Sequence, residues 1–143
     1  MTMKPTIAYV DGFNLFYGLL KGTRDLWLDP VEFVRRLLRE ELEEKRSDVN
    51  IATSMVLDAV NNRAESFVLV SGDTDFIGPV NIVRKDYGKN VIVLNPHTRR
   101  SDLKQYASYY KDISRDLPSQ CQLPDEIPIG THGNVIRRPL SWQ

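Results

Sequence analysis

The chain has 143 residues, of which 41% are hydrophobic and 27% are charged. This length and composition are ordinary for one globular domain with a buried core. Nineteen basic and nineteen acidic residues cancel, which excludes a strong overall attraction for polyanions, so any nucleic-acid surface must be local. Cys121 is the only cysteine, which excludes an internal disulfide and a cysteine-based zinc site and suits a reducing compartment.

Targeting signals are missing from the sequence. No apolar run approaches membrane-spanning length, and the amino terminus lacks the long apolar core of a signal peptide. These observations predict a cytoplasmic protein without a membrane partner. They leave the oligomeric state open, with a homo-oligomer as one option.

The first element is a short apolar run, residues 6–10, which is typical of a buried strand. Asp11 follows at once in the turn Asp-Gly-Phe-Asn, and apolar residues then recur at helical spacing over 15–20. The pattern predicts a strand, an acidic turn and a helix. Asn14 would face the cleft at this turn or simply cap the helix, and the sequence does not decide between the two.

Two helices are predicted next. After a loop over 21–28, Asp29 and Pro30 are a strong helix start, and apolar residues recur from Val34 to Leu42. The next helix opens at Ser47-Asp48 and ends at Asn61-Asn62. This second helix leads into the central strand and should therefore run antiparallel to it, with its first turn near the acidic edge of the sheet.

Two aspartates on the second helix are expected to lie in different environments. Asp48 lies in the first turn and is a candidate member of an acidic cluster, although it could be no more than a helix cap. Asp58 lies roughly 15 Å further along the helix axis at 1.5 Å per residue. We therefore expect Asp58 to be a surface residue outside the cluster.

The central stretch, residues 67–76, resembles the first element. An apolar run leads into Ser-Gly and then into Asp73 and Asp75, and helical spacing follows over 77–87. In a parallel sheet, the two acidic turns open at the same edge, which brings Asp11 towards Asp73 and Asp75. A helix-capping role for Asp73 or Asp75 is the alternative.

A third strand is predicted over 91–94, and it ends at the same edge of the sheet. His97, Arg99 and Arg100 follow it and form a small basic group where a phosphate backbone could lie, or a merely solvated loop. Ser101 can cap a helix that extends to Tyr110. A short last strand is predicted over 111–114.

The composition changes after the last predicted strand. From Leu117 the chain is rich in proline, glutamine and glycine, and apolar pairs flank a glycine-containing turn over 127–136. We expect a hairpin or an extended arm. The predicted organisation is a domain over 1–116 and a C-terminal extension over 117–143 that packs on the domain or reaches from it.

Three or four carboxylates at one edge of a parallel sheet suit an oxygen-preferring ion such as Mg²⁺ or Mn²⁺. Such ions bind phosphate oxygens and activate water, so metal-assisted phosphodiester hydrolysis fits these residues best. The predicted fold class is α/β, a Rossmann-like three-layer sandwich with a central, mostly parallel sheet and a C-terminal arm.

Three motifs carry a family resemblance. They are Tyr-Val-Asp-Gly-Phe-Asn at 9–14, Glu-Lys-Arg-Ser-Asp-Val-Asn-Ile-Ala at 44–52 and Val-Ser-Gly-Asp-Thr-Asp at 70–75. In this order they resemble the signatures of the NYN domain, a family of PIN-like ribonucleases with a bacterial LabA-like branch. The resemblance implies a PIN-like fold and a metal-dependent ribonuclease that acts on RNA, with single-stranded RNA as the expected substrate.

Carried over residue by residue, the resemblance implies a set of site residues. The implied catalytic and metal-binding residues are Asp11, Asp48, Asp73 and Asp75. The residues expected to contact substrate are Asn14, Ser71, Thr74, His97, Arg99 and Arg100.

The chain departs from the family pattern at two places. Many relatives have a further acidic residue where this sequence has Ser54. Relatives also have an additional strand-helix-strand segment where Leu38 and Lys45 are only seven positions apart. The main alternative is therefore a non-catalytic RNA-binding or regulatory module with the same fold. A phosphatase with an aspartyl nucleophile fits less well, because the Asp-x-Asp spacing expected after the first strand is absent.

Overall fold

The computed structural model describes residues 5–38, 51–131 and 133–143. Six strands lie within these ranges: β1 Thr6–Val10, β2 Ser66–Val70, β3 Asn90–Asn95, β4 Tyr109–Asp112, β5 Glu126–Ile129 and β6 Asn134–Arg137. The α-helices are α1 Gly12–Leu15, α2 Pro30–Leu38, α3 Ile51–Val60 and α4 Ile77–Asn81. Two π-helical segments, Phe16–Leu20 and Ile82–Asp86, continue α1 and α4, and short 3₁₀ helices cover Thr74–Phe76, Asp102–Gln105, Pro118–Gln120 and Leu140–Trp142.

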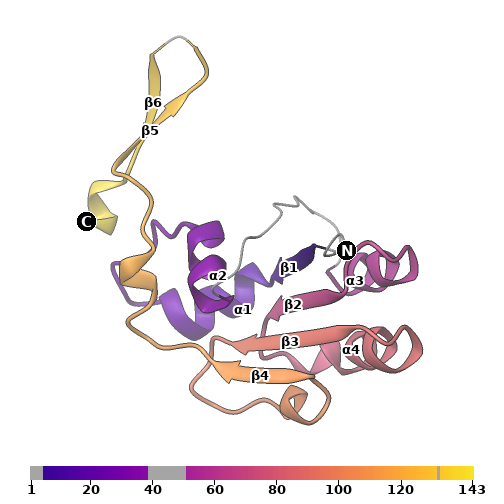
Figure 1. The fold of residues 1–143 in the computed structure, drawn as a ribbon. Coiled ribbons are helices and arrows are strands. Elements are labelled where there is room, and N and C mark those ends of the chain that lie inside the picture. The colour runs from indigo at the N-terminus through magenta and orange to yellow at the C-terminus, as the bar shows by residue number, and fades with distance from the viewer. Residues whose placement is uncertain (1–4, 39–50, 132) are drawn as a thin grey trace.

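The centre of the fold is a four-stranded parallel sheet with the order β1-β2-β3-β4 (Figure 1). The register aligns Val10 with Val70, and Val70 with Leu94. Strands β1, β2 and β3 therefore end at the same level, and the loops that follow them share one edge of the sheet. This confirms the predicted α/β fold class with a parallel central sheet.

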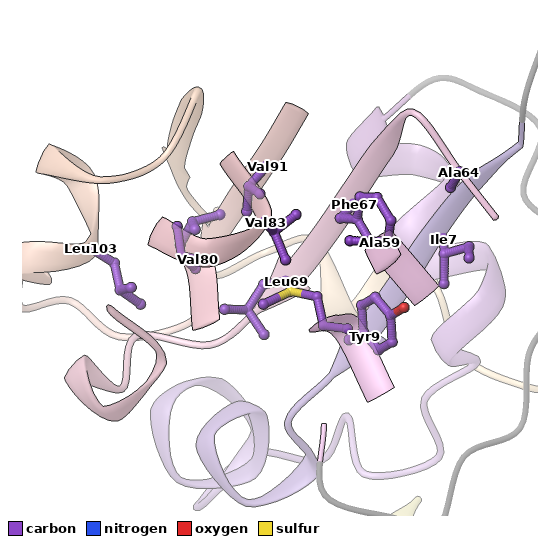
Figure 2. Close-up of a cluster of buried hydrophobic side chains, with 12 residues drawn as sticks. Ile7, Tyr9, Ala59, Ala64, Phe67, Leu69, Val80, Val83, Val91 and Leu103 are labelled. Carbon is purple, nitrogen blue, oxygen red and sulfur yellow. The ribbon is translucent and has the colours of Figure 1, made fainter. Parts of the chain in front are cut away.

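Helices cover both faces of the sheet, because alternate residues of each strand point to opposite sides. On one face, Phe67 and Leu69 pack with residues of α3 and α4 (Figure 2). On the other face, Val68 and Val70 pack with α1, its π-helical continuation and α2. The two central strands, β2 and β3, are buried on both faces over most of their length, which is why they read as continuous apolar runs in the sequence.

The start of α2 agrees with its capping signal. The Asp29 carboxylate accepts hydrogen bonds from the backbone N–H groups of Val31 and Glu32, each at 3.0 Å. Pro30 occupies the first helical position, where no N–H group is required. The predicted continuation of this helix to Leu42, like the helix start at Asp48, lies outside the described residues. None of the described helices is long and apolar enough to cross a membrane.

The expectation that Asp58 is a surface residue is wrong. Only 8% of Asp58 is exposed, and its carboxylate accepts a hydrogen bond of 2.6 Å from the hydroxyl group of Tyr9. An ion pair with Arg63 at 3.2 Å also compensates the buried charge. Burial, and then the contact with Asp58, raise the pKa of the Tyr9 hydroxyl group. Tyr9, 49 positions earlier in the chain, and Arg63, just after α3, are the partners of the Asp58 carboxylate, and the helix spacing does not identify either of them.

The segment after Ser101 also differs from its prediction. Ser101 does cap a helix, since its hydroxyl group accepts from the N–H of Leu103 at 3.2 Å, but this 3₁₀ helix ends at Gln105. Tyr110 lies in β4, which begins earlier than the predicted strand over 111–114. The apolar spacing that suggested one long helix instead spans a 3₁₀ turn and the start of a strand.

The C-terminal segment forms the predicted hairpin, and β5 and β6 stand away from the sheet (Figure 1). The chain that leads to the hairpin contacts the loop before α2, where Leu28 forms an isolated bridge with Gln122. The indole N–H of Trp27 donates to the carbonyl oxygen of Pro124 at 2.8 Å, and its ring lies 5.9 Å from that of Trp142. These contacts attach the base of the arm to the loop before α2.

Candidate functional site

The turn after β1 is organised by the Asp11 carboxylate. One oxygen accepts a hydrogen bond of 3.1 Å from the N–H of Asn14, which makes Asp11 the N-cap of α1. The other oxygen accepts a hydrogen bond of 3.0 Å from the hydroxyl group of Ser71. The backbone N–H of Asp11 also donates to Val70 at 3.0 Å. Asp11 therefore lies at the same edge of the sheet as the turn after β2, as predicted.

The turn after β2 is built around Ser71, which is fully buried. Its hydroxyl oxygen accepts a hydrogen bond of 3.1 Å from the N–H of Asp73 while the hydroxyl group donates to Asp11. Asp73 caps the following 3₁₀ helix, since one of its carboxylate oxygens accepts from the N–H of Asp75 at 3.0 Å. The capping role that the sequence offered as an alternative is thus real for Asp73, and it coexists with a position beside the Asp11 turn.

Asn14 joins the two turns and is not a helix cap. Its side-chain oxygen accepts a hydrogen bond of 2.7 Å from the backbone N–H of Gly72. This contact leaves the amide nitrogen of Asn14 as a donor for a ligand oxygen. A half-buried amide that is held in this way can orient an anionic group without adding charge.

Asn95 is a site residue that the sequence analysis missed. It is the last residue of β3, it is fully buried, and its amide nitrogen lies within 3.1 Å of the carbonyl oxygens of His97 and Arg99. The same nitrogen donates to the carboxylate of Asp112 at 2.9 Å. Asn95 therefore shapes the basic loop from inside. The sequence feature that could have identified Asn95 is its position at the end of a buried strand, at the edge of the sheet where the acidic turns lie.

Two glycines allow the basic loop to approach the other turns. A Cβ atom on Gly72 would lie 2.3 Å from the side-chain oxygen of Asn95. A Cβ atom on Gly18, in the π-helical segment, would lie 2.9 Å from the carbonyl oxygen of Pro96 and 3.0 Å from a ring nitrogen of His97. Side chains at these positions would push the loop away from β2 and from the first helical segment.

A second network holds the far end of the basic loop. The hydroxyl group of Tyr110 accepts from the N–H of Ser101 at 3.1 Å and donates to the carboxylate of Asp112 at 3.0 Å. Burial is the main cause that raises the pKa of the Tyr110 hydroxyl group. Because Asp112 also accepts from Asn95, β4 fixes both ends of the loop.

A cleft of about 490 Å³ lies between these turns. Its lining includes six of the predicted site residues and four others, namely Asn14, Asp73, Thr74, His97, Arg99 and Arg100, together with Gly72, Asn95, Ser101 and Asp102. Asp11 and Ser71 lie next to the lining, through the hydrogen bonds given above. Asp75 is exposed and is not part of the lining, and Asp48 lies outside the described residues.

The donor atoms at this edge are oxygens. On the acidic side they are the carboxylates of Asp11 and Asp73 and the hydroxyl group of Ser71, and oxygen ligands of this kind suit Mg²⁺ or Mn²⁺. Within the described ranges, no group of three or more His, Cys, Asp and Glu side chains is placed to hold a metal ion. The expected ligand set also contains Asp48, so the metal site remains a prediction.

The sheet, its two helical layers and the cleft at the carboxyl ends of the strands define an α/β protein of the Rossmann-like class. Residues 8–114 match the NYN domain, and the chain belongs to this family. The family resemblance inferred from the three motifs is thereby confirmed, and with it a nuclease-like fold of the PIN type.

The chain is similar to a named bacterial protein and to a solved bacterial structure. The chain is 28% identical over 114 residues to 6-hydroxy-3-succinoylpyridine 3-monooxygenase HspA of Pseudomonas putida (strain DSM 28022 / S16). The match covers 76% of this chain but only 36% of that protein's length. The crystal structure of a Vibrio parahaemolyticus RIMD 2210633 protein of unknown function superposes with a TM-score of 0.51 at 21% identity, and the match covers 81% of this chain and 97% of that one. The second likeness supports the fold alone.

Proposed function

We propose that the protein is a metal-dependent ribonuclease that hydrolyses phosphodiester bonds of single-stranded RNA in the cleft. The observation that carries the proposal is the link through Ser71, whose hydroxyl group donates to the Asp11 carboxylate and accepts from the backbone N–H of Asp73. The two acidic turns therefore meet at the edge of the sheet where the basic loop also lies. Acidic groups for an ion and basic groups for a phosphate backbone thus line one site.

The residues of the cleft take two roles in this proposal. Asp11, Asp48, Asp73 and Asp75 would hold the ion, as the family motifs imply. When bound, Mg²⁺ or Mn²⁺ lowers the pKa of a water molecule and offsets the charge of the phosphate group. Asn14 and Ser71 keep the carboxylates and the Gly72 backbone in place.

The other side of the cleft binds substrate. Arg99 and Arg100 are exposed cationic side chains at its rim, and they can contact phosphate oxygens. His97 and Thr74 also line the cleft and add hydrogen-bonding groups. These contacts read the backbone and not the base sequence, so they supply affinity and position.

A metal titration with single-stranded RNA tests the proposal. Wild type should cleave in Mg²⁺ or Mn²⁺, and Asp73→Asn should abolish cleavage while RNA affinity is largely retained. Metal should also raise the melting temperature of the wild type more than that of Asp73→Asn, because the ion relieves repulsion between carboxylates. Asp86→Asn changes an exposed carboxylate at the end of the π-helical segment Ile82–Asp86 and serves as the control.

The rival function is a non-catalytic RNA-binding module. The lack of a three-residue acidic group among the described side chains is the observation that favours it. This rival predicts no cleavage, no metal-dependent melting shift and a loss of affinity when Arg99 and Arg100 become alanine. Wild type that responds to no divalent ion in either assay would rule out the ribonuclease proposal.

We further propose the domain division at residue 116, and the end of the family match at residue 114 supports it. The monooxygenase name of the Pseudomonas putida relative describes a protein of which this chain spans 36%. That protein's reaction is therefore not carried over to this chain.

A further inference from the structure

Exposed aromatic rings are concentrated in the helical stretch that follows β1. Among the described residues, five large aromatic side chains are exposed, and three of them are Phe13, Phe16 and Tyr17. Phe13 is 80% exposed and Tyr17 is 58% exposed. We call these three residues the aromatic segment. Its degree of exposure is unusual for phenylalanine, which is normally among the buried residue types.

The aromatic segment belongs to the same helical stretch as two residues that contact the cleft or the basic loop. Asn14 lines the cleft, and Gly18 packs against the carbonyl oxygen of Pro96 and the ring of His97. Residues four apart in a helix lie on one face, so Asn14 and Gly18 face the basic loop. Phe13 and Tyr17 share the same spacing one position earlier, so they lie on the adjacent face of the helical stretch, where both are exposed.

Charged groups flank the rings. The ammonium group of Lys21 lies 5.1 Å from the centre of the Tyr17 ring, within the range of a cation–π contact. Phe16 and Tyr17 pack edge to face, with ring centres 5.1 Å apart and an interplanar angle of 82°. The rings thus lie beside one cation, and Gly18 in the same helical stretch packs against the basic loop. Aromatic rings close to cationic groups are the combination found in surfaces that bind single-stranded nucleic acids.

We propose that the aromatic segment is a stacking surface for unpaired bases of the RNA whose backbone crosses the cleft. The inference rests on the proposed function and names the side chains that contact the bases of its single-stranded substrate. Phosphates contact Arg99 and Arg100, and the bases turn outward onto Phe13 and Tyr17. Bases in a duplex are already stacked and paired, so the surface selects single-stranded over double-stranded RNA.

The experiment compares affinities for RNA that has or lacks bases. Labelled single-stranded RNA, an abasic oligonucleotide of the same length and a duplex are titrated in EDTA, which prevents metal-dependent cleavage. Phe13→Leu and Tyr17→Leu keep an apolar side chain but remove the ring, and each should weaken binding of the base-bearing strand roughly 5- to 100-fold. Affinity for the abasic strand should not change, and Phe13→Tyr should bind like wild type.

The control is Tyr87→Leu, which removes an exposed ring outside the aromatic segment and should affect no ligand. Unchanged affinity of Phe13→Leu and Tyr17→Leu would overturn the stacking surface, and cleavage by the wild type would then leave the ribonuclease proposal standing. Wild type that neither binds nor cleaves RNA would overturn both. A wild-type dimer that dissociates in Phe13→Leu at unchanged RNA affinity would show that another protein chain covers the rings, and the stacking surface would again be wrong.

Discussion

The hydroxyl group of Ser71 donates a hydrogen bond of 3.0 Å to the carboxylate of Asp11, and this contact joins the ends of β1 and β2. Because Ser71 also accepts from the N–H of Asp73, one fully buried oxygen positions both turns. The acidic side of the cleft therefore depends on a residue that lies next to its lining and not within it.

Ser71→Ala should affect both stability and activity. The substitution leaves the N–H of Asp73 without its partner, and the free energy of unfolding should fall by about 1–3 kcal/mol. RNA cleavage should fall roughly tenfold or more, because the Asp11 carboxylate loses the hydroxyl group that positions it. A loss of about 1.4 kcal/mol in transition-state stabilisation corresponds to a factor of ten in rate. Urea unfolding and initial cleavage rates measure the two effects. Ser119→Ala removes an exposed hydroxyl group and should change neither, so an equal loss in both variants would contradict this role of Ser71.

Gly72→Ala and Gly78→Ala form a matched pair. A methyl group at position 72 would lie 2.3 Å from the side chain of Asn95, whereas one at position 78 would meet nothing within 4 Å. Gly72→Ala should therefore lower the melting temperature, at a cost of about 1–3 kcal/mol, and weaken RNA binding. Gly78→Ala lies in α4 and should stabilise the protein by up to about 1 kcal/mol. A Gly72→Ala variant with wild-type affinity would show that the basic loop does not need this close approach.

Asn95→Asp should disrupt the basic loop through charge alone. The new carboxylate would face the carbonyl oxygens of His97 and Arg99 and the carboxylate of Asp112. We expect a loss of about 2–4 kcal/mol at neutral pH, because an unpaired buried charge replaces an amide group whose two N–H hydrogens face these three acceptors. Urea unfolding should show a smaller loss at acidic pH, where the protonated carboxyl group can donate again.

The exchanged pair Asn95→Asp with Asp112→Asn is the control for that result. An amide at position 112 can donate to the new carboxylate, so the double variant should recover part of the lost stability. If the loss of stability in the double variant equals the sum of the losses in the two single variants, the two positions are not in direct contact.

Tyr9→Phe tests the buried pair with Asp58. The substitution removes a hydrogen bond to a charged group in the core, and unfolding should become easier by about 1.5–3 kcal/mol. Tyr109→Phe, at a position where the ring is 57% exposed, should have little effect. A loss of stability in Tyr9→Phe but not in Tyr109→Phe would show that the hydrogen bond to Asp58 is the source of the stability. Equal losses in both variants would contradict this.

The same tyrosine should give a pH dependence. Burial and the contact with Asp58 raise the pKa of Tyr9 in the folded state, so the folded protein keeps its proton where the unfolded chain loses it. The stabilising effect is complete below the unfolded pKa of about 10 and declines as the pH rises above it. Between pH 9 and 11, the free energy of unfolding should fall less steeply with pH for Tyr9→Phe than for wild type. Parallel curves would mean that Tyr9 ionises as it does in the unfolded chain.

The sequence by itself determined the elements that depend on neighbouring residues. Apolar runs of β-strand length predicted β1, β2 and β3, and the Asp29-Pro30 pair predicted the start of α2. Because the strands are parallel and end in similar turns, the sequence also predicted that Asp11 and Asp73 share one edge. Each of these inferences needed only local backbone preferences and the geometry of a parallel sheet.

Only the tertiary structure decided how side chains from distant positions meet. Asp58 is buried because Tyr9 and Arg63 satisfy its carboxylate, and helix spacing alone could not identify those partners. Asn95 shapes the basic loop because Asp112, on the next strand, comes within 2.9 Å of its amide group. Such contacts depend on which strands are adjacent and on how closely glycines let loops approach. Local sequence patterns do not contain that information, because hydrogen bonds and charge pairs in a core form between whichever groups the fold brings together.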